Sequence, residues 1–113
     1  MVPTSLPTTG IVAVFSAYTI NGGGIYHMRA ANGSRIINDN NIVTVIGTPA
    51  FTAAFASASS ASIIETNNVW PPGPTGPRIV IDTAGGINSS GQPQATYFPG
   101  TSAGSLTAPG WWQ

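Results

Sequence analysis

Short runs of β-branched and aromatic residues alternate with turn-forming residues along most of the chain. The first run spans residues 11–20 and ends at Asn21 and three glycines, and similar runs follow at 25–30, 34–37 and 42–46. Such side chains fit the half-buried surface of a sheet, whereas clusters of Gly and Asn end strands. The pattern predicts four strands of similar length separated by turns, which favours an antiparallel sheet.

The dipeptide Asn32-Gly33 lies between two of these runs. A two-residue type I′ turn needs positive φ at both central positions, and Asn followed by Gly accepts that conformation best. The sequence therefore predicts a β-hairpin that joins residues 25–30 to residues 34–37.

One Ala-rich segment departs from the strand pattern. Thr48 can act as an N-cap and Pro49 suits the first helical position. Phe51 and Phe55 are four residues apart, so they share one face of a helix. We expect one short helix of about three turns near residues 49–58, with its Phe pair packed on the sheet.

The proline-rich stretch 71–77 has Gly at every third position, as collagen does. Two such triplets are too few for a triple helix. Predicted strands flank the stretch at 61–65 and 78–82, so we interpret it as a rigid loop inside one domain that covers residues 1–113.

The region from Ala84 to Gly110 is rich in turn residues but carries aromatic side chains. Exposed tails rarely contain so much apolar area, which favours an ordered, extended C-terminal arm. Adjacent side chains of an extended strand point to opposite faces, so burial of both terminal indoles needs material on two sides. We expect a subunit interface formed by Tyr97, Phe98, Trp111 and Trp112. The resulting fold class is a mostly β, antiparallel sandwich or barrel-like domain with one short helix.

Charge is scarce: 5% of the residues are charged and the formal net charge is zero, against about 25% charged residues in an ordinary soluble domain. Such a surface tends to associate, so a homo-oligomer is favoured over a glycosylated or secreted monomer. Three arginines cannot neutralise many phosphates, which argues against nucleic acid. No apolar run approaches the ~18 residues of a membrane helix.

Candidate catalytic and metal-binding groups are few. His27 is the only histidine, and nothing marks a nucleophile beside it. Glu65 and Asp82 could form a glycosidase pair, but hydrogen bonding at strand ends is the commoner role. The turn 38–41 offers one carboxylate for Ca²⁺, and Asx-rich turns need no metal. We expect no enzyme activity, no cofactor and no metal site.

Several short blocks occur in an order that resembles the C-terminal module of bacteriophage and prophage tail-fibre-like virion proteins. They cover roughly the second half of the chain, and two features depart from the family pattern: the prolines at 71–74 and the terminal Trp pair. The blocks are Gly47-Thr-Pro-Ala-Phe51, Ser62-Ile-Ile-Glu65, Thr75-Gly-Pro-Arg78, Gly86-Ile-Asn-Ser89 and Ala95 to Gly104.

The resemblance implies a structural protein of a phage virion, assembled in the bacterial host cytoplasm. The short chain suggests a small head-decoration or tail-surface subunit whose partners are further copies of itself, such as a trimer, and other virion proteins. The alternative is a receptor-binding tail-fibre tip whose aromatic side chains stack on host surface glycans.

Overall fold

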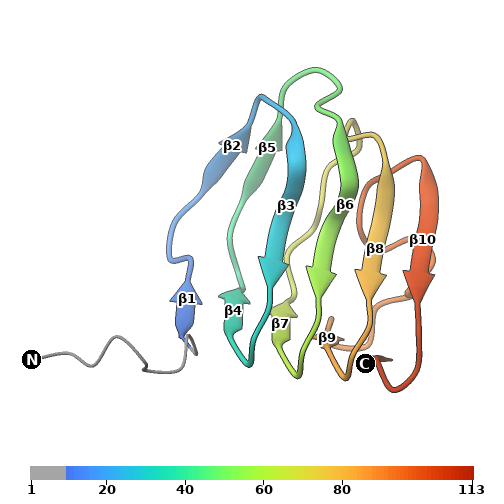
Figure 1. Ribbon diagram of the computed structural model, residues 1–113. Coiled ribbons are helices and arrows are strands. Elements are labelled where there is room, and N and C mark those ends of the chain that lie inside the picture. The colour runs from blue at the N-terminus through green and yellow to red at the C-terminus, as the bar shows by residue number, and fades with distance from the viewer. Residues whose placement is uncertain (1–9) are drawn as a thin grey trace, which may run out of the picture.

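The computed structural model describes residues 10–113, which form eleven short strands joined by turns and loops (Figure 1). Within these residues there is no helix. The strands are β1 (Ile11–Ala13), β2 (Tyr18–Ile20), β3 (Gly24–Ala30), β4 (Arg35–Asn38), β5 (Val43–Val45), β6 (Phe51–Ala58), β7 (Ile63–Thr66), β8 (Pro77–Ile81), β9 (Gly86–Asn88), β10 (Ser102–Leu106) and β11 (Trp111–Trp112).

Every strand pair is parallel. Sheet A has the order β1-β4-β7-β9-β11, sheet C the order β10-β8-β6-β3, and the small sheet B pairs β2 with β5. The chain therefore winds in successive coils, which stack side by side from β1 to β10 (Figure 1). The first coil is β1, β2 and β3, the second β4, β5 and β6, the third β7 and β8, and the fourth β9 and β10. Successive partners in sheet A are about 25 residues apart, a period typical of solenoids: Ile11, Arg35, Ile63, Gly86 and Trp111.

This β-solenoid-like arrangement corrects the predicted antiparallel sandwich or barrel. The turn Asn32-Gly33 has φ of 56° and 72°, so its predicted type I′ backbone is present. It does not close a hairpin, because β3 pairs with β6 and β4 pairs with β1 and β7. The turn carries the chain from sheet C to sheet A.

Two later coils repeat this turn with residues that disfavour it. Ser60 and Ala61 have φ of 53° and 59°, and Thr83 and Ala84 have φ of 43° and 63°. The turns also bond to one another, since Gly33 N donates to the Ser60 carbonyl and Ala61 N donates to the Thr83 carbonyl, at 2.8 and 3.0 Å. Stacking between coils therefore imposes a left-handed backbone that Ser, Thr and Ala adopt only at a cost.

The predicted helix near residues 49–58 is wrong, because that segment contains the strand β6 at the centre of sheet C. A spacing of four residues is a multiple of two, so Phe51 and Phe55 share a face of a strand as well as a face of a helix. Both are buried, as are Ala54, Ala56 and Ala58. Parallel pairing with β3 and β8 overrides the helical preference of Ala, which is only a weak prior.

The core lies between the sheets and combines an aliphatic row with an aromatic cluster. Along sheet C, the aligned residues Ala30, Ala58 and Ile81 are almost fully buried. The rings beside this row pack edge-on or tilted, with centroids 5.2 to 5.8 Å apart for Phe55, Trp70 and Phe98. The proline-rich loop runs from β7 to β8 inside the domain, as predicted.

A network of asparagine side chains joins the second and third coils. Asn38 and Asn68 are each 2% exposed. Asn38 Oδ1 accepts from Asn68 Nδ2 at 2.7 Å and from Asn41 Nδ2 at 2.9 Å, and Asn38 Nδ2 donates to the Tyr18 hydroxyl at 2.9 Å. The buried amides are thus satisfied across coils, which keeps the register of the stack.

Candidate functional site

Four of the seven large hydrophobic side chains that are exposed among residues 10–113 belong to the first coil. Within these residues, no strand pairs with the outer edge of β1, β2 or β3. We call this surface the open edge. Four of its large hydrophobic side chains are exposed to solvent by 59 to 89%: Ile11, Val12, Phe15 and Ile25.

The open edge has little that would prevent pairing with another chain. Sheet edges are usually protected by charges, prolines or bulges. The strands β1, β2 and β3 contain one charged residue, Arg29, whose guanidinium lies 5.2 Å from the ring centre of Tyr26. The register shifts between Gly24 and Tyr26, which is the only irregularity in these three strands. The edge is therefore poorly protected against association.

A cavity of about 440 Å³ lies behind the open edge, lined chiefly by first-coil residues that include Val12, Val14, Tyr18 and Met28. His27 also lines it and stacks on Phe55, with ring centres 4.3 Å apart. The Tyr18 hydroxyl lies 3.0 Å from His27 Nε2. Burial lowers the pKa of His27 to about 4, so the ring is neutral at physiological pH.

The four predicted interface residues lie around the last coils. Phe98 is 1% exposed and belongs to the core of its own chain, so it has no surface for a partner. Tyr97, Trp111 and Trp112 are half-buried. β11 pairs with β9, Trp112 Nε1 donates to the Gln92 carbonyl at 2.8 Å, and the Tyr97 hydroxyl donates to the Asn68 carbonyl at 2.7 Å. A subunit contact through these three half-buried residues stays a prediction.

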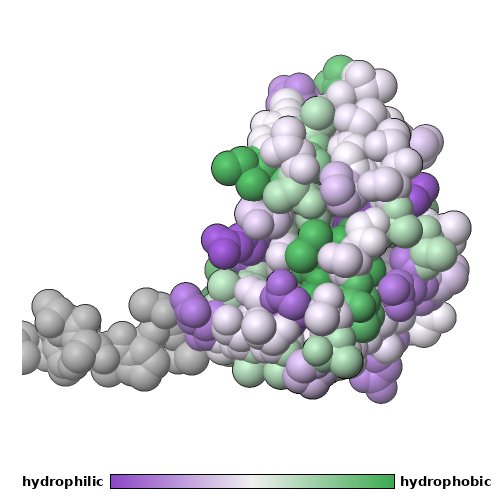
Figure 2. All heavy atoms as spheres, turned by 45° about the vertical axis from the view of Figure 1, so that its right-hand side comes forward, coloured by the Kyte–Doolittle hydropathy of each residue, from purple (hydrophilic) through white to green (hydrophobic). Residues whose placement is uncertain are grey.

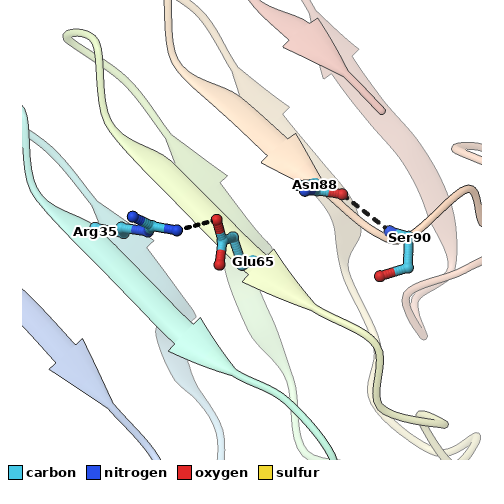
Figure 3. A network of polar contacts seen from close by, with 4 residues as sticks. All are labelled: Arg35, Glu65, Asn88 and Ser90. Atoms are coloured by element: carbon cyan, nitrogen blue, oxygen red, sulfur yellow. Dashed lines mark hydrogen bonds and ion pairs between the residues drawn. The ribbon is translucent and has the colours of Figure 1, made fainter.

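The acidic residues considered for catalysis take part in local contacts. Glu65 on β7 forms an ion pair with Arg35 on the adjacent strand β4, and Asn88 on β9 accepts from Ser90 N further along the same sheet (Figure 3). Asp82 accepts from the Thr83 hydroxyl at 3.1 Å in the turn between β8 and β9. Each carboxylate therefore accepts a hydrogen bond from a neighbouring side chain.

The asparagine side chains of the 38–41 turn form hydrogen bonds with backbone and side-chain amide groups. Asn41 Nδ2 donates to the Val14 carbonyl, and Asn40 Oδ1 accepts from Asn67 Nδ2, at 2.9 and 3.0 Å. Within the described part of the chain, no three His, Cys, Asp or Glu side chains lie close enough to hold a metal ion together. None of its elements is a helix long and apolar enough to cross a membrane.

Comparisons of the chain with protein-family models, curated proteins and solved structures found no match.

The importance of the open edge was not predicted. The sequence marks residues 11–20 and 25–30 as strands, but strands at an edge and in the interior have the same local pattern. The available signal was the near absence of charge in this region, which departs from the usual protection of an edge.

Proposed function

We propose that this protein is a structural subunit of a bacteriophage virion, a head-decoration or tail-surface component, that assembles through its open edge. The observation that carries the proposal is the combination of unpaired strand edges with exposed Ile11, Val12, Phe15 and Ile25 on one coil. Exposed apolar patches of this kind mark association sites in soluble proteins. The phage context comes from the sequence blocks, which extend from the loop after β5 to the middle of β10.

The low charge of the chain and the face shown in Figure 2 support a subunit rather than an isolated monomer. On the face shown in Figure 2, strongly hydrophilic side chains form small separate groups among residues of intermediate hydropathy, with a hydrophobic group near the centre. Of the three arginines, Arg35 is already paired with Glu65. Contacts between subunits would therefore depend on apolar burial and backbone hydrogen bonds.

The occupant that fits the open edge best is the open edge of a second copy. Two identical edges related by a two-fold axis pair antiparallel, β1 with β1 and β3 with β3, and such a contact is closed. Head-to-tail stacking of copies would instead pair the open edge of one copy with β10 of the next. That strand is exposed, rich in small residues and irregular, with Gly104 at φ 82°. The β10 end of the solenoid is therefore less suited to strand pairing with another copy than the open edge is.

Sedimentation velocity of the full chain at increasing concentration tests this proposal. The double variant Ile11→Lys/Ile25→Lys places charge on both edge strands and should remain monomeric where the unmodified chain associates. Val69→Lys is the matched control, because Val69 is 86% exposed but lies in the loop after β7. Equal association of the double variant and the control would refute assembly through the open edge.

A further inference from the structure

A second hollow lies far along the chain from the open edge, between the proline-rich loop and the segment 96–100. Its volume is about 250 Å³, slightly below the roughly 300 to 1,000 Å³ of sites for drug-sized ligands. The space therefore suits a ligand the size of one sugar ring. Its walls are rigid, because prolines contribute from both loops: Pro72, Pro74 and Pro99.

Arg78 provides the only charged group in the lining of this hollow. Among residues 10–113, Arg35 pairs with Glu65 and Arg29 lies over the Tyr26 ring, whereas Arg78 has no acidic or aromatic-face partner. Arg78 is half-buried, and its Nε atom, like that of Arg35, is buried and makes no hydrogen bond. A buried donor without an acceptor is unfavourable, so this group calls for an explanation.

The Arg78 side chain is held in position by its neighbours. A Cβ on Gly100 would lie 2.8 Å from Arg78 Cγ and 2.7 Å from the Gly76 carbonyl oxygen. The absence of a side chain at position 100 thus lets the aliphatic stem pack closely against the backbone. The stem is therefore held close to the backbone as far as Cγ, which leaves fewer torsions to be ordered when a ligand binds.

Aromatic rings form the other wall. Trp70 is 9% exposed, and its Nε1 makes no hydrogen bond of ordinary geometry. The Tyr97 ring is fixed because its hydroxyl donates to the Asn68 carbonyl at 2.7 Å. Burial raises the pKa of Tyr97. The hollow therefore joins aromatic surface to one unpaired, planar cation.

We propose that this hollow binds a small sugar ring that carries a carboxylate, such as a uronic acid. The carboxylate would accept hydrogen bonds from the Arg78 guanidinium, whose planar fork matches its geometry. The C–H face of the ring would pack on the half-buried Tyr97 ring and on the small exposed part of Trp70. The site is independent of the open edge, and it would give a virion subunit a contact to acidic glycans.

Two-dimensional ¹H–¹⁵N NMR of the full chain, titrated with glucuronate, glucose or acetate, tests the site. Glucuronate should bind in the millimolar range and shift the signals of Arg78 Nε–H and Trp70 Nε1–H. Glucose, which lacks the carboxylate, and acetate, which lacks the ring, should each bind at least ten-fold more weakly. If acetate binds as tightly as glucuronate, the hollow is a carboxylate site and the proposal of a sugar ligand is wrong. If glucose binds as tightly as glucuronate, the proposed role of Arg78 is wrong.

Variants make the test specific. Arg78→Gln should weaken glucuronate binding at least ten-fold, and Arg78→Lys should also weaken it because the planar fork is lost. Arg29→Gln is the matched control, since it removes one arginine on β3, outside this hollow, and should leave binding unchanged. The same spectra report whether each variant is folded. Equal losses in the Arg78 and Arg29 variants, or no binding of glucuronate to the unmodified chain, would refute the site.

Discussion

The indole ring of Trp111 lies over Gly86 on the neighbouring strand, at a position where Gly86 could carry no side chain without displacing the ring. The two residues are direct partners of β11 and β9 in sheet A. The C-terminal strand β11 therefore packs on β9 of its own chain and extends sheet A beyond the fourth coil.

Gly86→Ala should push Trp111 out of this position. We expect a loss of about 1 to 3 kcal/mol in the free energy of unfolding, the usual cost of overpacking a well-packed site, together with a red-shifted tryptophan emission. Gly22→Ala is the control, because a Cβ there meets nothing within 4 Å. Urea unfolding followed by fluorescence measures both effects. Equal stability of the two variants would show that β11 is not seated on β9.

Substitution of glycine for a residue in one of the left-handed turns should raise the free energy of unfolding. Ala84 is exposed and has φ of 63°, so Ala84→Gly relieves backbone strain of roughly 1 to 2 kcal/mol. Glycine also raises the entropy of the unfolded chain, which leaves a net stabilisation of up to about 1 kcal/mol. Ala103→Gly, at an exposed position in β10, should instead destabilise. Thermal unfolding that shows a loss in both variants would contradict the stacked turns.

The buried asparagine network predicts a large effect at its centre. Asn38→Leu removes the partner of Tyr18, Asn41 and Asn68 and should cost about 3 kcal/mol, because several buried polar groups lose hydrogen bonds at once. Asn67→Ala breaks exposed bonds to Asn40 and should cost less than about 1 kcal/mol. Chemical unfolding of both variants separates the two cases. A cost below about 1 kcal/mol for Asn38→Leu would mean that the network does not hold the coils in register.

The neutral, half-buried His27 makes the stability of the protein depend on pH. Its pKa is about 4 in the folded protein against 6.5 ordinarily, so the unfolded chain binds a proton first as the pH falls. Stability from this group is therefore complete above pH 6.5 and decreases as the pH falls from 6.5 towards 4, by on the order of 3 kcal/mol. His27→Phe should lose this dependence. Unfolding curves of the two proteins at several pH values test it, and parallel pH profiles would contradict the burial of the imidazole.

Association through the open edge should resist salt. The contact contains few charges, and at about 1 M salt the screening length falls to ~3 Å, which weakens only Coulomb terms. Apolar burial is unaffected or strengthened. We therefore expect the sedimentation behaviour of the full chain to persist in molar NaCl. Dissociation on addition of NaCl alone would show that charge pairs carry the contact.

The sequence predicted strands and turns better than the way in which they pair. The Asn32-Gly33 backbone was identified from its residues, because local sterics determine it. Whether such a turn closes a hairpin depends on residues far along the chain, and Arg35 instead aligns with Ile63. The repeat of about 25 residues was the available signal, but small, dissimilar residues occupy its turns, so the period is hard to recognise.

The same limits explain the wrong helix prediction and the unexpected burial of Phe98. Phe51 and Phe55 could not distinguish strand from helix, since their spacing fits both periods. Among the predicted interface residues, Phe98 is aromatic and lies in a turn-rich segment, yet it points into the core. Edge and interior strands share the same hydrophobic pattern, so the near absence of charge in the first coil was the available signal for the open edge.

Hydrogen exchange of the backbone amides tests assembly through the open edge most directly. The unmodified full chain would be compared at a concentration where it is monomeric and at one where sedimentation shows association. We predict that amides of β1 and β3 exchange at least ten-fold more slowly in the associated protein, because new hydrogen bonds form along those edges, while amides of β10 are unchanged. Protection confined to β10 and β11, or no change in β1 and β3, would contradict the proposed assembly.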